Sequence, residues 1–552
     1  MRNIVIVGTG AAGLVAAITA AECGLRVTLL EKANQWGGTS SWSGGALWIP
    51  AHPLMLENGV SDSLESARAY MDSCISQSGE ASSPERRDAY LRTGPEMVRF
   101  LADVGMKWEF SPFPDYYIER ENARGGRGLG AAAFDGSELG DWVKTLRPAS
   151  QVPQVAIEPL EVLPLLMATK NLKNLISSAR VGLRTLGRRL AGERPLWMGQ
   201  ALVARLMQIA LKRGVDVRLG TALVDLLTEN GRVVGARVRH NGVDSDLRAD
   251  AGIVLCAGGF ARNSALRKKY QGVDDCLSAA VPEDTGDALH AALKLGAATT
   301  LLDEAWWGVS AVFPDDTRYF LLWERTFPHS LIVDAGGNRF ADEAAPYNDF
   351  GRAVLDRQRE FAGAPCWLIM DARHRRNYVF GNLLGGYTPD SLISKGVFKK
   401  ASSLEDLARQ CHLDPAALQR TVERFNVFAK TGKDEDFGRG DTIFDRVYGD
   451  ADTKPNPTLG AVEQAPFWAV RVHPSDLGTK GGLLTDADGR VVDTAGQPIP
   501  GLYASGNATA SVMGRGYPGP GATLGPATVF AYRAVRHAVL AGAPAGERAA
   551  SA

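Results

Sequence analysis

The most constraining feature of the chain is a glycine-rich turn between two apolar segments near the N-terminus. Residues 4–7 are Ile-Val-Ile-Val and residues 27–30 are Val-Thr-Leu-Leu, and such apolar runs are typical of buried parallel strands. The Ala-rich segment between them has the pattern of a crossover helix. The turn, residues 8–13, is Gly-Thr-Gly-Ala-Ala-Gly. A Gly-x-Gly-x-x-Gly turn from strand to helix predicts a dinucleotide-binding unit.

Each glycine of this turn has a physical purpose. Gly8 permits the tight turn, Gly10 lets the backbone approach a pyrophosphate, and Gly13 lets the helix pack closely on the strand. The helix N-terminus offers N–H groups and a positive dipole end to the phosphates. Glu31 ends the second strand, where a carboxylate can accept hydrogen bonds from an adenosine ribose.

Composition limits the classes of protein to which the chain can belong. Its 552 residues predict at least two domains, and a net charge of −1 gives no global attraction to nucleic acid. The six cysteines form no Cys-x-x-Cys pair, so we expect neither a metal site nor a disulfide framework. The chain shows no leader pattern and no apolar run of spanning length, which favours an intracellular protein.

Further glycine-rich segments later in the chain favour FAD over a nicotinamide dinucleotide. Residues 252–259 form an apolar run that ends in Gly-Gly, and residues 501–507 form a second such run. In two-part flavin domains such strands return the chain to the cofactor sheet. Residues 514–526, rich in Gly and Pro, lead into a predicted helix over 527–540, whose N-terminus is expected to face the pyrimidine end of the flavin.

The fold class that these segments predict is α/β. A Rossmann-like FAD-binding domain is expected from residues 1–305 and 474–552, with an inserted α+β catalytic domain over residues 306–473. Two helices are expected within residues 61–105, the first capped by Asp62 or Ser63, and another within residues 413–433. A hairpin is expected around the Asn-Gly turn at residues 230–231.

The loop at residues 37–45, Gly-Gly-Thr-Ser-Ser-Trp-Ser-Gly-Gly, resembles flavoproteins of the fumarate reductase and succinate dehydrogenase type. In the covalently flavinylated members of that group a histidine lies in this loop. This chain has Thr and Ser there, so the resemblance implies non-covalent FAD. The expected cofactor-binding residues are Gly8, Gly10, Ala12, Gly13, Glu31, Lys32, Gly37, Gly38, Thr39, Ser40, Ser43, Gly44, Gly45, Gly258, Gly259, Asp287, Gly506, Asn507, Gly521, Thr523 and Leu524.

Three other stretches resemble the bacterial 3-ketosteroid Δ1-dehydrogenases. They are Phe-Pro-Asp-Tyr-Tyr at 113–117, Pro-Tyr-Asn-Asp-Phe-Gly-Arg at 346–352, and Gly-Arg-Gly-Tyr-Pro-Gly-Pro-Gly at 514–521. The segments 37–43 and 475–482 match as well, so the resemblance covers nearly the whole chain. The Tyr-Pro-Gly-Pro-Gly run is the most diagnostic, because succinate and fumarate enzymes carry dicarboxylate-binding Arg and His instead.

The resemblance implies a reaction and a role for four residues. The family removes hydrogen from C1 and C2 of ring A of a 3-ketosteroid, which leaves a 1,2 double bond. Tyr347 corresponds to the general base that takes the C2 proton, and Tyr116 to the residue that relays or stabilises its charge. Tyr517 and the backbone N–H of Gly521 correspond to the groups that hold the C3 carbonyl, while the flavin N5 receives the C1 hydride.

Alternatives to this function remain open at this point. One is a related flavin dehydrogenase that forms a 4,5 double bond in ring A. Another is a membrane-attached electron-transfer flavoprotein subunit that binds no steroid. For the dehydrogenase, a quinone-type or artificial electron acceptor is expected, and the sequence gives neither the preferred steroid nor the oligomeric state.

Residues 160–202 look like an insertion and contain a basic amphipathic helix. The helical period places one set of apolar residues on a single face: Leu172, Leu175, Ile176, Ala179, Leu183, Leu186 and Leu190. The opposite face carries Lys173, Ser177, Arg180, Arg184 and Arg188. Such a helix is typical of a membrane-surface element, and the one-sided basic charge favours peripheral attachment to the inner face of the cell membrane. The alternative is an ordinary surface helix with a solvated basic face.

Overall fold

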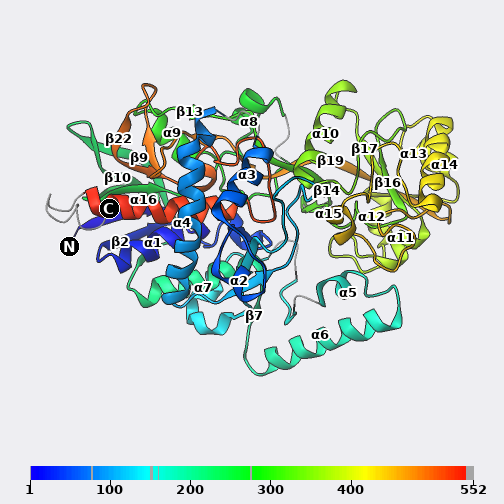
Figure 1. Cartoon of the computed structure of the whole chain (residues 1–552), viewed down its shortest axis with the longest axis horizontal. Coiled ribbons are helices and arrows are strands. Elements are labelled where there is room, and N and C mark those ends of the chain that lie inside the picture. Colours follow the sequence, from blue (N-terminus) through cyan, green and yellow to red (C-terminus); the bar gives the residue numbers. More distant parts are fainter. Residues whose placement is uncertain (1, 76–78, 150–152, 159–160, 274–276, 542–552) are drawn as a thin grey trace.

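The computed structural model describes residues 2–75, 79–149, 153–158, 161–273 and 277–541. Two β-sheets, at opposite ends of an elongated molecule, organise the chain (Figure 1). The first has the order β21-β22-β12-β1-β2-β8. Its strands are β1 (Asn3–Val7), β2 (Arg26–Leu30), β8 (Asp216–Arg218), β12 (Gly252–Leu255), β21 (Arg490–Val492) and β22 (Pro498–Ala504). All of these pair in parallel except β21, which is antiparallel to β22.

The glycine turn at residues 8–13 joins β1 to helix α1 (Ala11–Glu22), as the sequence predicts. Helix α1 is buried along nearly its whole length because its Ala-rich surface lets α7 (Met198–Lys212) and α16 (Leu524–Ala541) pack close to it. Helix α16, the last described helix, therefore packs on α1, the first (Figure 1).

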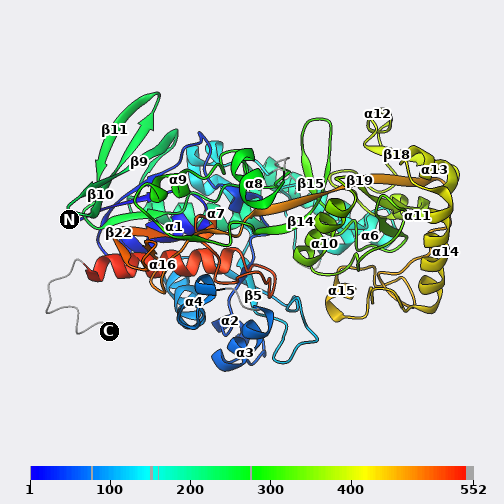
Figure 2. The same cartoon turned by 90° about the horizontal axis from the view of Figure 1, so that it is seen from above.

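The second sheet has the order β15-β14-β19-β17-β16, with β18 also paired to β19. Its strands are β14 (Ala305–Val312), β15 (Arg318–Phe320), β16 (Ser330–Val333), β17 (Cys366–Met370), β18 (Phe398–Ala401) and β19 (Phe467–Thr479). The helices around it are α10 (Tyr347–Glu360), α11 (Ala372–Asn377), α12 (Asp390–Ser394), α13 (Leu404–Gln410), α14 (Pro415–Thr431) and α15 (Ile443–Val447). The long strand β19 runs from this sheet towards the first one (Figure 2).

The predicted hairpin is part of a separate antiparallel sheet. Strands β9 (Thr221–Glu229) and β10 (Arg232–His240) pair across the Asn-Gly turn, and β11 (Val243–Arg248) adds a third strand that the sequence did not predict. The three strands project from one end of the molecule (Figure 2). Strand β10 of this antiparallel sheet also contacts β12 and β22 of the first sheet.

The predicted helix caps are present where local chemistry specifies them. Helix α3 (Leu64–Cys74) begins at Ser63, whose side chain accepts a hydrogen bond from the Ser66 N–H, whereas the Asp62 carboxylate pairs with Arg127. Helix α4 (Pro84–Asp103) begins at a proline, and Asp414 caps α14. The smaller elements are β3 (Leu47–Trp48), β4 (Trp108–Ser111), β5 (Gly128–Ala131), β6 (Phe134–Asp135), β7 (Pro195–Leu196), β13 (Thr299–Thr300), β20 (Gly482–Leu483), α2 (Pro53–Glu57), α8 (Ser264–Gln271) and α9 (Asp287–Leu293).

The segment predicted to be an insertion contains α5 (Val162–Leu166) and α6 (Leu172–Leu190), which lie along one edge of the molecule (Figure 1). Leu172, Leu183 and Leu190 are 71%, 70% and 81% exposed, whereas Val181 and Thr185 are buried. The apolar face of α6 therefore points outward, away from the protein. Leu160 and the tail after Ala541 lie outside the described residues. Across the described ranges, no helix combines the length and apolarity needed to span a bilayer.

Candidate active site

The glycine turn has the shape of a nucleotide cradle. A Cβ added at Gly8 would lie 2.3 Å from the Cys256 carbonyl oxygen, and one at Gly13 would lie 1.8 Å from the Gly8 carbonyl oxygen. These two glycines are therefore required by the packing of β1, β12 and α1. A Cβ at Gly10 would approach only the Ser40 hydroxyl, at 3.3 Å. Gly10 accordingly leaves room beside the helix N-terminus for a ligand, which fits the predicted pyrophosphate.

Glu31 lies at the carboxyl end of β2, as predicted, and is engaged within the protein. Its carboxylate accepts hydrogen bonds from the Thr9 N–H at 3.2 Å and from the Ala33 N–H at 3.0 Å. The Thr9 hydroxyl also donates to it and accepts from the Gly37 N–H at 3.1 Å. Glu31 thus fixes the glycine turn against the loop at residues 37–45, and its contact with a ribose stays a prediction.

The loop at residues 37–45 lies beside the glycine turn, and its hydroxyl groups hold backbone in place. The Ser40 hydroxyl accepts the Ala11 N–H at 3.0 Å, and the Thr39 hydroxyl accepts the Val281 N–H at 3.2 Å. Ser43 accepts the Gly45 N–H at 3.0 Å. The loop therefore has a fixed shape next to the N-terminus of α1, where the phosphates of a dinucleotide are expected.

Two predicted cofactor residues bind each other. The Lys32 ammonium lies 2.7 Å from the Asp287 carboxylate. Lys32 follows the carboxyl end of β2, and Asp287 is the first residue of α9. Nearby, Asp284 is buried against Gly258, and burial and the neighbouring Asp476 raise its pKa to about 7. Within the described part of the chain, one oxygen of Asp284, Oδ1, has no hydrogen-bond partner. Asp284 was not predicted from the sequence, although its place directly before Thr-Gly-Asp was an available signal.

A cavity lies between the N-terminal end of α16 and the second sheet. Gly506, Asn507 and Thr523, all predicted cofactor residues, line it together with Trp306 of β14. Trp306 donates its indole N–H to the Asn507 side chain at 3.0 Å. Leu524 is the first residue of α16, so the positive end of that helix lies at this cavity. Two of its lining residues, Trp306 and Thr523, also contact Tyr517.

Three tyrosines that lie far apart in the sequence meet beside this cavity. The ring of Tyr517 stacks on that of Tyr116, with centroids 5.2 Å apart. The Tyr347 ring makes T-shaped contacts with both, its centroid lying 5.0 Å from that of Tyr517 and 5.6 Å from that of Tyr116. Tyr116, Tyr347 and Tyr517 are only 4%, 7% and 2% exposed. The structure thus brings together the three tyrosines that the family resemblance singled out. We call them the tyrosine cluster.

Each tyrosine is held by its own local structure. Tyr116 donates its backbone N–H to the Pro518 carbonyl at 2.9 Å, which ties the loop at 113–117 to the Tyr-Pro-Gly-Pro-Gly run. Tyr347 is the first residue of α10, directly after Pro346, a residue suited to the start of a helix. The Tyr517 hydroxyl lies 3.2 Å from the Thr523 hydroxyl. Thr523, predicted to bind the cofactor, therefore also orients Tyr517.

Gly521 lies in the turn between the tyrosine run and α16. Its φ of 96° is in the region that favours glycine, and an added Cβ would lie 2.6 Å from the Ala46 backbone. The Gly521 carbonyl accepts the Trp48 N–H at 3.1 Å. A side chain cannot be accommodated here, so the backbone of Gly521 is presented in one fixed position close to Tyr517.

The electrostatics of the tyrosine cluster favour neutral phenols. Burial raises the pKa of Tyr347 well above its ordinary value, and the neighbouring Tyr116 and Tyr517 raise it further. Burial also raises the pKa of Tyr116 and of Tyr517. The position of Tyr347 at the N-terminus of α10 acts in the opposite sense, because the helix dipole favours an anion there.

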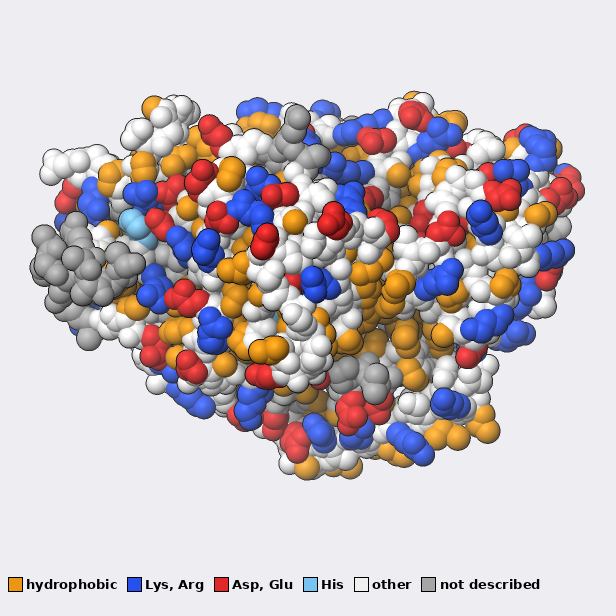
Figure 3. All heavy atoms as spheres, in the orientation of Figure 1, with side chains coloured by type: hydrophobic (Ala, Val, Ile, Leu, Met, Phe, Trp, Pro, Cys, Tyr) orange, Lys and Arg blue, Asp and Glu red, His pale blue; other side chains and the backbone are white. Residues whose placement is uncertain are grey.

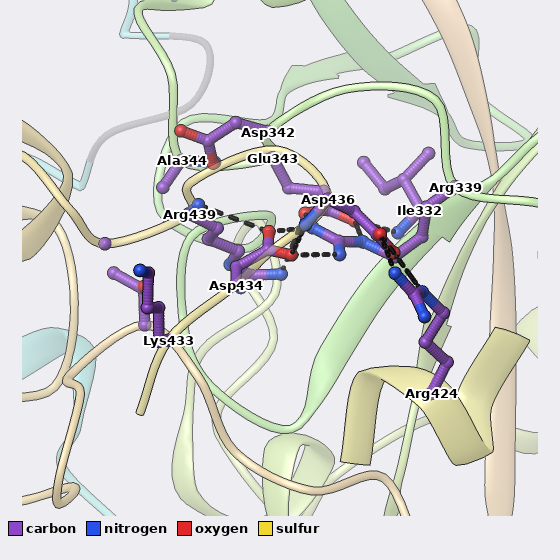
Figure 4. Close-up of polar contacts among 12 residues, drawn as sticks. Ile332, Arg339, Asp342, Glu343, Ala344, Arg424, Lys433, Asp434, Asp436 and Arg439 are labelled. Carbon is purple, nitrogen blue, oxygen red and sulfur yellow. Dashed lines mark hydrogen bonds and ion pairs between the residues drawn. The ribbon is translucent and has the colours of Figure 1, made fainter. Parts of the chain in front are cut away.

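The loop that leads to Tyr347 is anchored by a buried ionic network (Figure 4). The Arg339 guanidinium makes two hydrogen bonds to Glu343, at 2.9 and 2.8 Å, and two to Asp434, at 3.0 and 2.8 Å. Arg439 lies 3.2 Å from the Glu343 carboxylate and donates to the Ser330 carbonyl at 2.9 Å. These four side chains, Arg339, Glu343, Asp434 and Arg439, fix residues 339–346 against the second sheet.

The chain is similar to known proteins over nearly its whole length. The family described as "FAD binding domain" matches residues 3–524. The 3-oxosteroid 1-dehydrogenase of Mycobacterium tuberculosis (strain ATCC 25618 / H37Rv) is 40% identical, over 97% of this chain and 98% of its own length. The 4-oxocyclohexanecarboxylate 2-dehydrogenase of Sinomonas cyclohexanicum is 35% identical, over 99% of this chain and 93% of its own length.

A solved structure is also similar over the full length. The crystal structure of 3-ketosteroid delta1-dehydrogenase from Sterolibacterium denitrificans in complex with 1,4-androstadiene-3,17-dione has a TM-score of 0.91 and 36% identity, and it covers 98% of this chain and 100% of that one. The chain therefore belongs to the FAD binding domain family and, within it, to the 3-oxosteroid 1-dehydrogenases. It is an FAD-dependent oxidoreductase of the group that acts on CH–CH donors, so the predicted family, fold class and cofactor are confirmed.

Proposed function

We propose that the protein desaturates ring A of 3-ketosteroids between C1 and C2. The observation that carries this proposal is the meeting of Tyr116, Tyr347 and Tyr517 in one buried cluster beside the cofactor edge. Three phenols in contact suit a reaction that moves a proton and polarises a carbonyl. The names of the similar proteins support a cyclic ketone as the substrate.

In this proposal Tyr347 is the base that takes the C2 proton. The electron pair of the broken C2–H bond becomes the new C1–C2 double bond as a hydride leaves C1. Bound FAD supplies the acceptor for that hydride. Tyr116, whose ring contacts both other tyrosines, passes on or stabilises the charge that forms on Tyr347. The residues that would hold FAD are those of the glycine turn, the 37–45 loop and the N-terminal end of α16.

Tyr517 and Gly521 hold the C3 carbonyl. A C2 proton is acidic only when the C3 oxygen can take up negative charge, so hydrogen-bond donors must be fixed around that oxygen beforehand. The Thr523 contact orients the Tyr517 hydroxyl, and Gly521 has a backbone position that admits no side chain. Pro518 and Pro520 restrict the backbone conformations of the Tyr-Pro-Gly-Pro-Gly run.

The steroid site is proposed at the junction of the two halves of the molecule, with residues 306–473 as the catalytic domain. A row of aromatic side chains continues outward from the cluster: Phe444 contacts Tyr116, Tyr448 contacts Phe444, and Trp323 contacts Tyr448. The row ends near Met167, directly after α5. Figure 3 shows hydrophobic side chains lining a hollow between the halves above α5, which suits an apolar polycyclic substrate.

Turnover with an artificial electron acceptor, followed by product identification, tests this proposal. A 3-ketosteroid saturated in ring A offers both the 1,2 and the 4,5 positions. The expected product carries a 1,2 double bond, and a 4,5 double bond alone would instead support the related dehydrogenase. An electron-transfer subunit without a steroid site would give no product. The physiological acceptor is proposed to be a quinone-type molecule.

We further propose that α6 attaches the protein peripherally to a membrane. Leucines cover its outward face, and the basic residues Lys173, Arg180 and Arg189 are exposed beside them. Arg184, predicted on the polar face, points to the protein instead and pairs with Glu161. Hydrophobic and basic side chains accordingly share the lower right edge of the molecule in Figure 3. Such a surface matches an interface of anionic headgroups and acyl chains.

Co-sedimentation with vesicles that contain anionic phospholipid tests the attachment. Leu183→Asp is expected to weaken binding at least about tenfold, because one buried leucine contributes roughly 1.5–3 kcal/mol. The matched control is Val427→Asp on α14, another exposed apolar residue. Equal binding of both variants and the wild type would contradict membrane attachment through α6.

A further inference from the structure

Lys480 is a fully buried lysine to which neither the sequence analysis nor the proposed reaction gives a role. It lies between β19 and β20, in the segment that resembles the family. Its ammonium donates to the carbonyl oxygens of Gly516 and Arg515, at 3.0 and 3.3 Å, and to the Asn348 side-chain oxygen at 3.3 Å. A lysine has three donors, so these acceptors use all of them. All three acceptors are neutral.

The acceptors of Lys480 adjoin two residues of the tyrosine cluster. Asn348 follows Tyr347 at the start of α10, and Gly516 precedes Tyr517. The ammonium therefore ties the start of α10 to the loop at residues 514–521. Lys480 Nζ also lies 4.4 Å from the centroid of the Trp306 ring and 6.0 Å from that of Tyr517. A cation at this distance from an aromatic ring is attracted to its face.

The carboxylates near Lys480 are engaged by other residues. Glu304, before β14, pairs with Arg352 of α10 and with Arg515. Asp349 of α10 accepts the Tyr117 hydroxyl at 2.9 Å, and Asp303 pairs with Arg515 at 2.7 Å. No carboxylate in the described portion of the chain forms an ion pair with Lys480. Lys480 is therefore held beside the tyrosine cluster without a direct ion-pair partner, and Glu304 and Asp349 favour its charge only from a longer distance.

Holding an ammonium in this position is costly. Burial and the neighbouring Arg352 lower the pKa of Lys480 to about 7, which shows that the folded protein disfavours the charge. If Lys480 served packing alone, an apolar side chain of similar volume could take its place with no loss of stability. Negative charge on a nearby phenol or carbonyl oxygen reverses this preference, since the two charges then favour each other.

We propose that Lys480 is a positioning residue of the active site. It fixes Tyr347 and Tyr517 relative to each other, and its positive charge stabilises the negative charge that proton abstraction creates in the cluster. This inference rests on the proposed function.

The test is anaerobic stopped-flow reduction of the flavin by a 3-keto-4-ene steroid, measured from pH 6 to 10. Lys480→Met holoprotein is expected to bind FAD and steroid but to reduce the flavin at least about 100-fold more slowly at pH 7, the size of effect expected when one preorganised stabilising group is lost. The deficit should narrow as the pH rises above about 7, because Lys480 of the wild type loses its own positive charge there. Lys480→Arg keeps the charge and should recover part of the rate. The matched control is Lys430→Met at the exposed end of α14.

Two results would overturn the inference. The first is Lys480→Met holoprotein with the rate and pH profile of the wild type. The second applies if Lys480→Met does not bind FAD, in which case Asn348→Ala, which removes one acceptor of the ammonium, is tested instead. This variant is expected to slow the reaction about tenfold, which corresponds to about 1.4 kcal/mol. An unchanged rate would exclude a role for the hydrogen bond between Lys480 and Asn348. If the wild type itself is not reduced by steroid, the proposed function has failed instead.

Discussion

Residues 339–347 take part in two buried polar regions, and these regions use charge in opposite ways. In the ionic network of Arg339, Glu343, Asp434 and Arg439, each charge lies within 3.2 Å of an opposite charge (Figure 4). In the tyrosine cluster, three phenols contact one another and the nearby Lys480 bonds only to neutral oxygens. One region is electrostatically satisfied, and the other is not.

The pKa shifts follow this difference. Burial by itself would raise the pKa of Glu343, but Arg339 and Arg439 outweigh burial and lower it, and Arg339 lowers that of Asp434 in the same way. In the cluster nothing outweighs burial, so the pKa of Tyr347 is raised. Groups whose pKa is shifted by burial without an offsetting charge are common at sites of proton transfer. The network should therefore determine stability, and the cluster should determine the reaction rate.

The largest expected effect is that of Tyr347→Phe. Removal of the proposed base should lower the rate of steroid-dependent flavin reduction by about 10³–10⁴-fold, near the upper end of the range for general base catalysis. The phenyl ring still fills the same space, so FAD content and the thermal midpoint should stay close to those of the wild type. Stopped-flow absorbance and thermal melts check both. A rate within tenfold of the wild type would place the base elsewhere.

Arg339→Met should have the converse effect. Its loss leaves the buried Asp434 carboxylate without its ion-pair partner and leaves Glu343 with Arg439 alone, which should lower the free energy of unfolding by about 3–5 kcal/mol, measured by urea titration. The folded fraction should keep a near-normal rate. The matched control is Arg424→Met, because Arg424 pairs with Asp436 at the exposed surface nearby and should cost at most about 1 kcal/mol. Equal costs for the two variants would contradict the contrast between the regions.

The stability effect of Arg339 should also depend on pH. Glu343 and Asp434 have folded-state pKa values below their unfolded values of roughly 4.3 and 3.9, so their pairing contributes stability above those values and loses it as pH falls through the folded pKa values. The difference in unfolding free energy between wild type and Arg339→Met should therefore shrink below about pH 4. A difference that stays constant into acid would argue against the ion pairs as its source.

The smallest expected effect is the pH dependence of the wild-type rate. Because burial raises the pKa of Tyr347 above its ordinary value near 10, the reactive phenolate is a minor species at neutral pH. The rate of flavin reduction should increase from pH 7 to pH 10, with no decline in that range. A maximum below pH 8 would mean that a group other than a tyrosine takes the proton.

Local sequence patterns were sufficient to predict the strand-turn-helix-strand unit that is proposed to hold the cofactor. Gly8 to Glu31 lie within one strand-turn-helix-strand unit, so their spacing alone indicates their arrangement. Similarly, Ser63 and Asp414 act on N–H groups two or three residues away. The tyrosine cluster was found only through the family resemblance, because the order of three distant segments in space is not encoded in the spacing of Tyr116, Tyr347 and Tyr517.

Other features could not be predicted because they depend on tertiary packing. The 3.6-residue period showed that α6 has an apolar face, but a period does not tell which face meets the protein. The partners of Lys480 come from α10 and from the loop at residues 514–521, more than 30 positions away on either side. The same holds for Arg339, whose partner Asp434 lies 95 residues later. Charged residues at such separations look like ordinary surface residues in a sequence.

Anaerobic titration of the yellow holoprotein with a 3-keto-4-ene steroid tests the central claim most directly. The account predicts that one equivalent of steroid bleaches the flavin absorbance and that the recovered steroid carries a new 1,2 double bond. A flavin that stays oxidised in the presence of excess steroid, or a recovered steroid without that double bond, would contradict it.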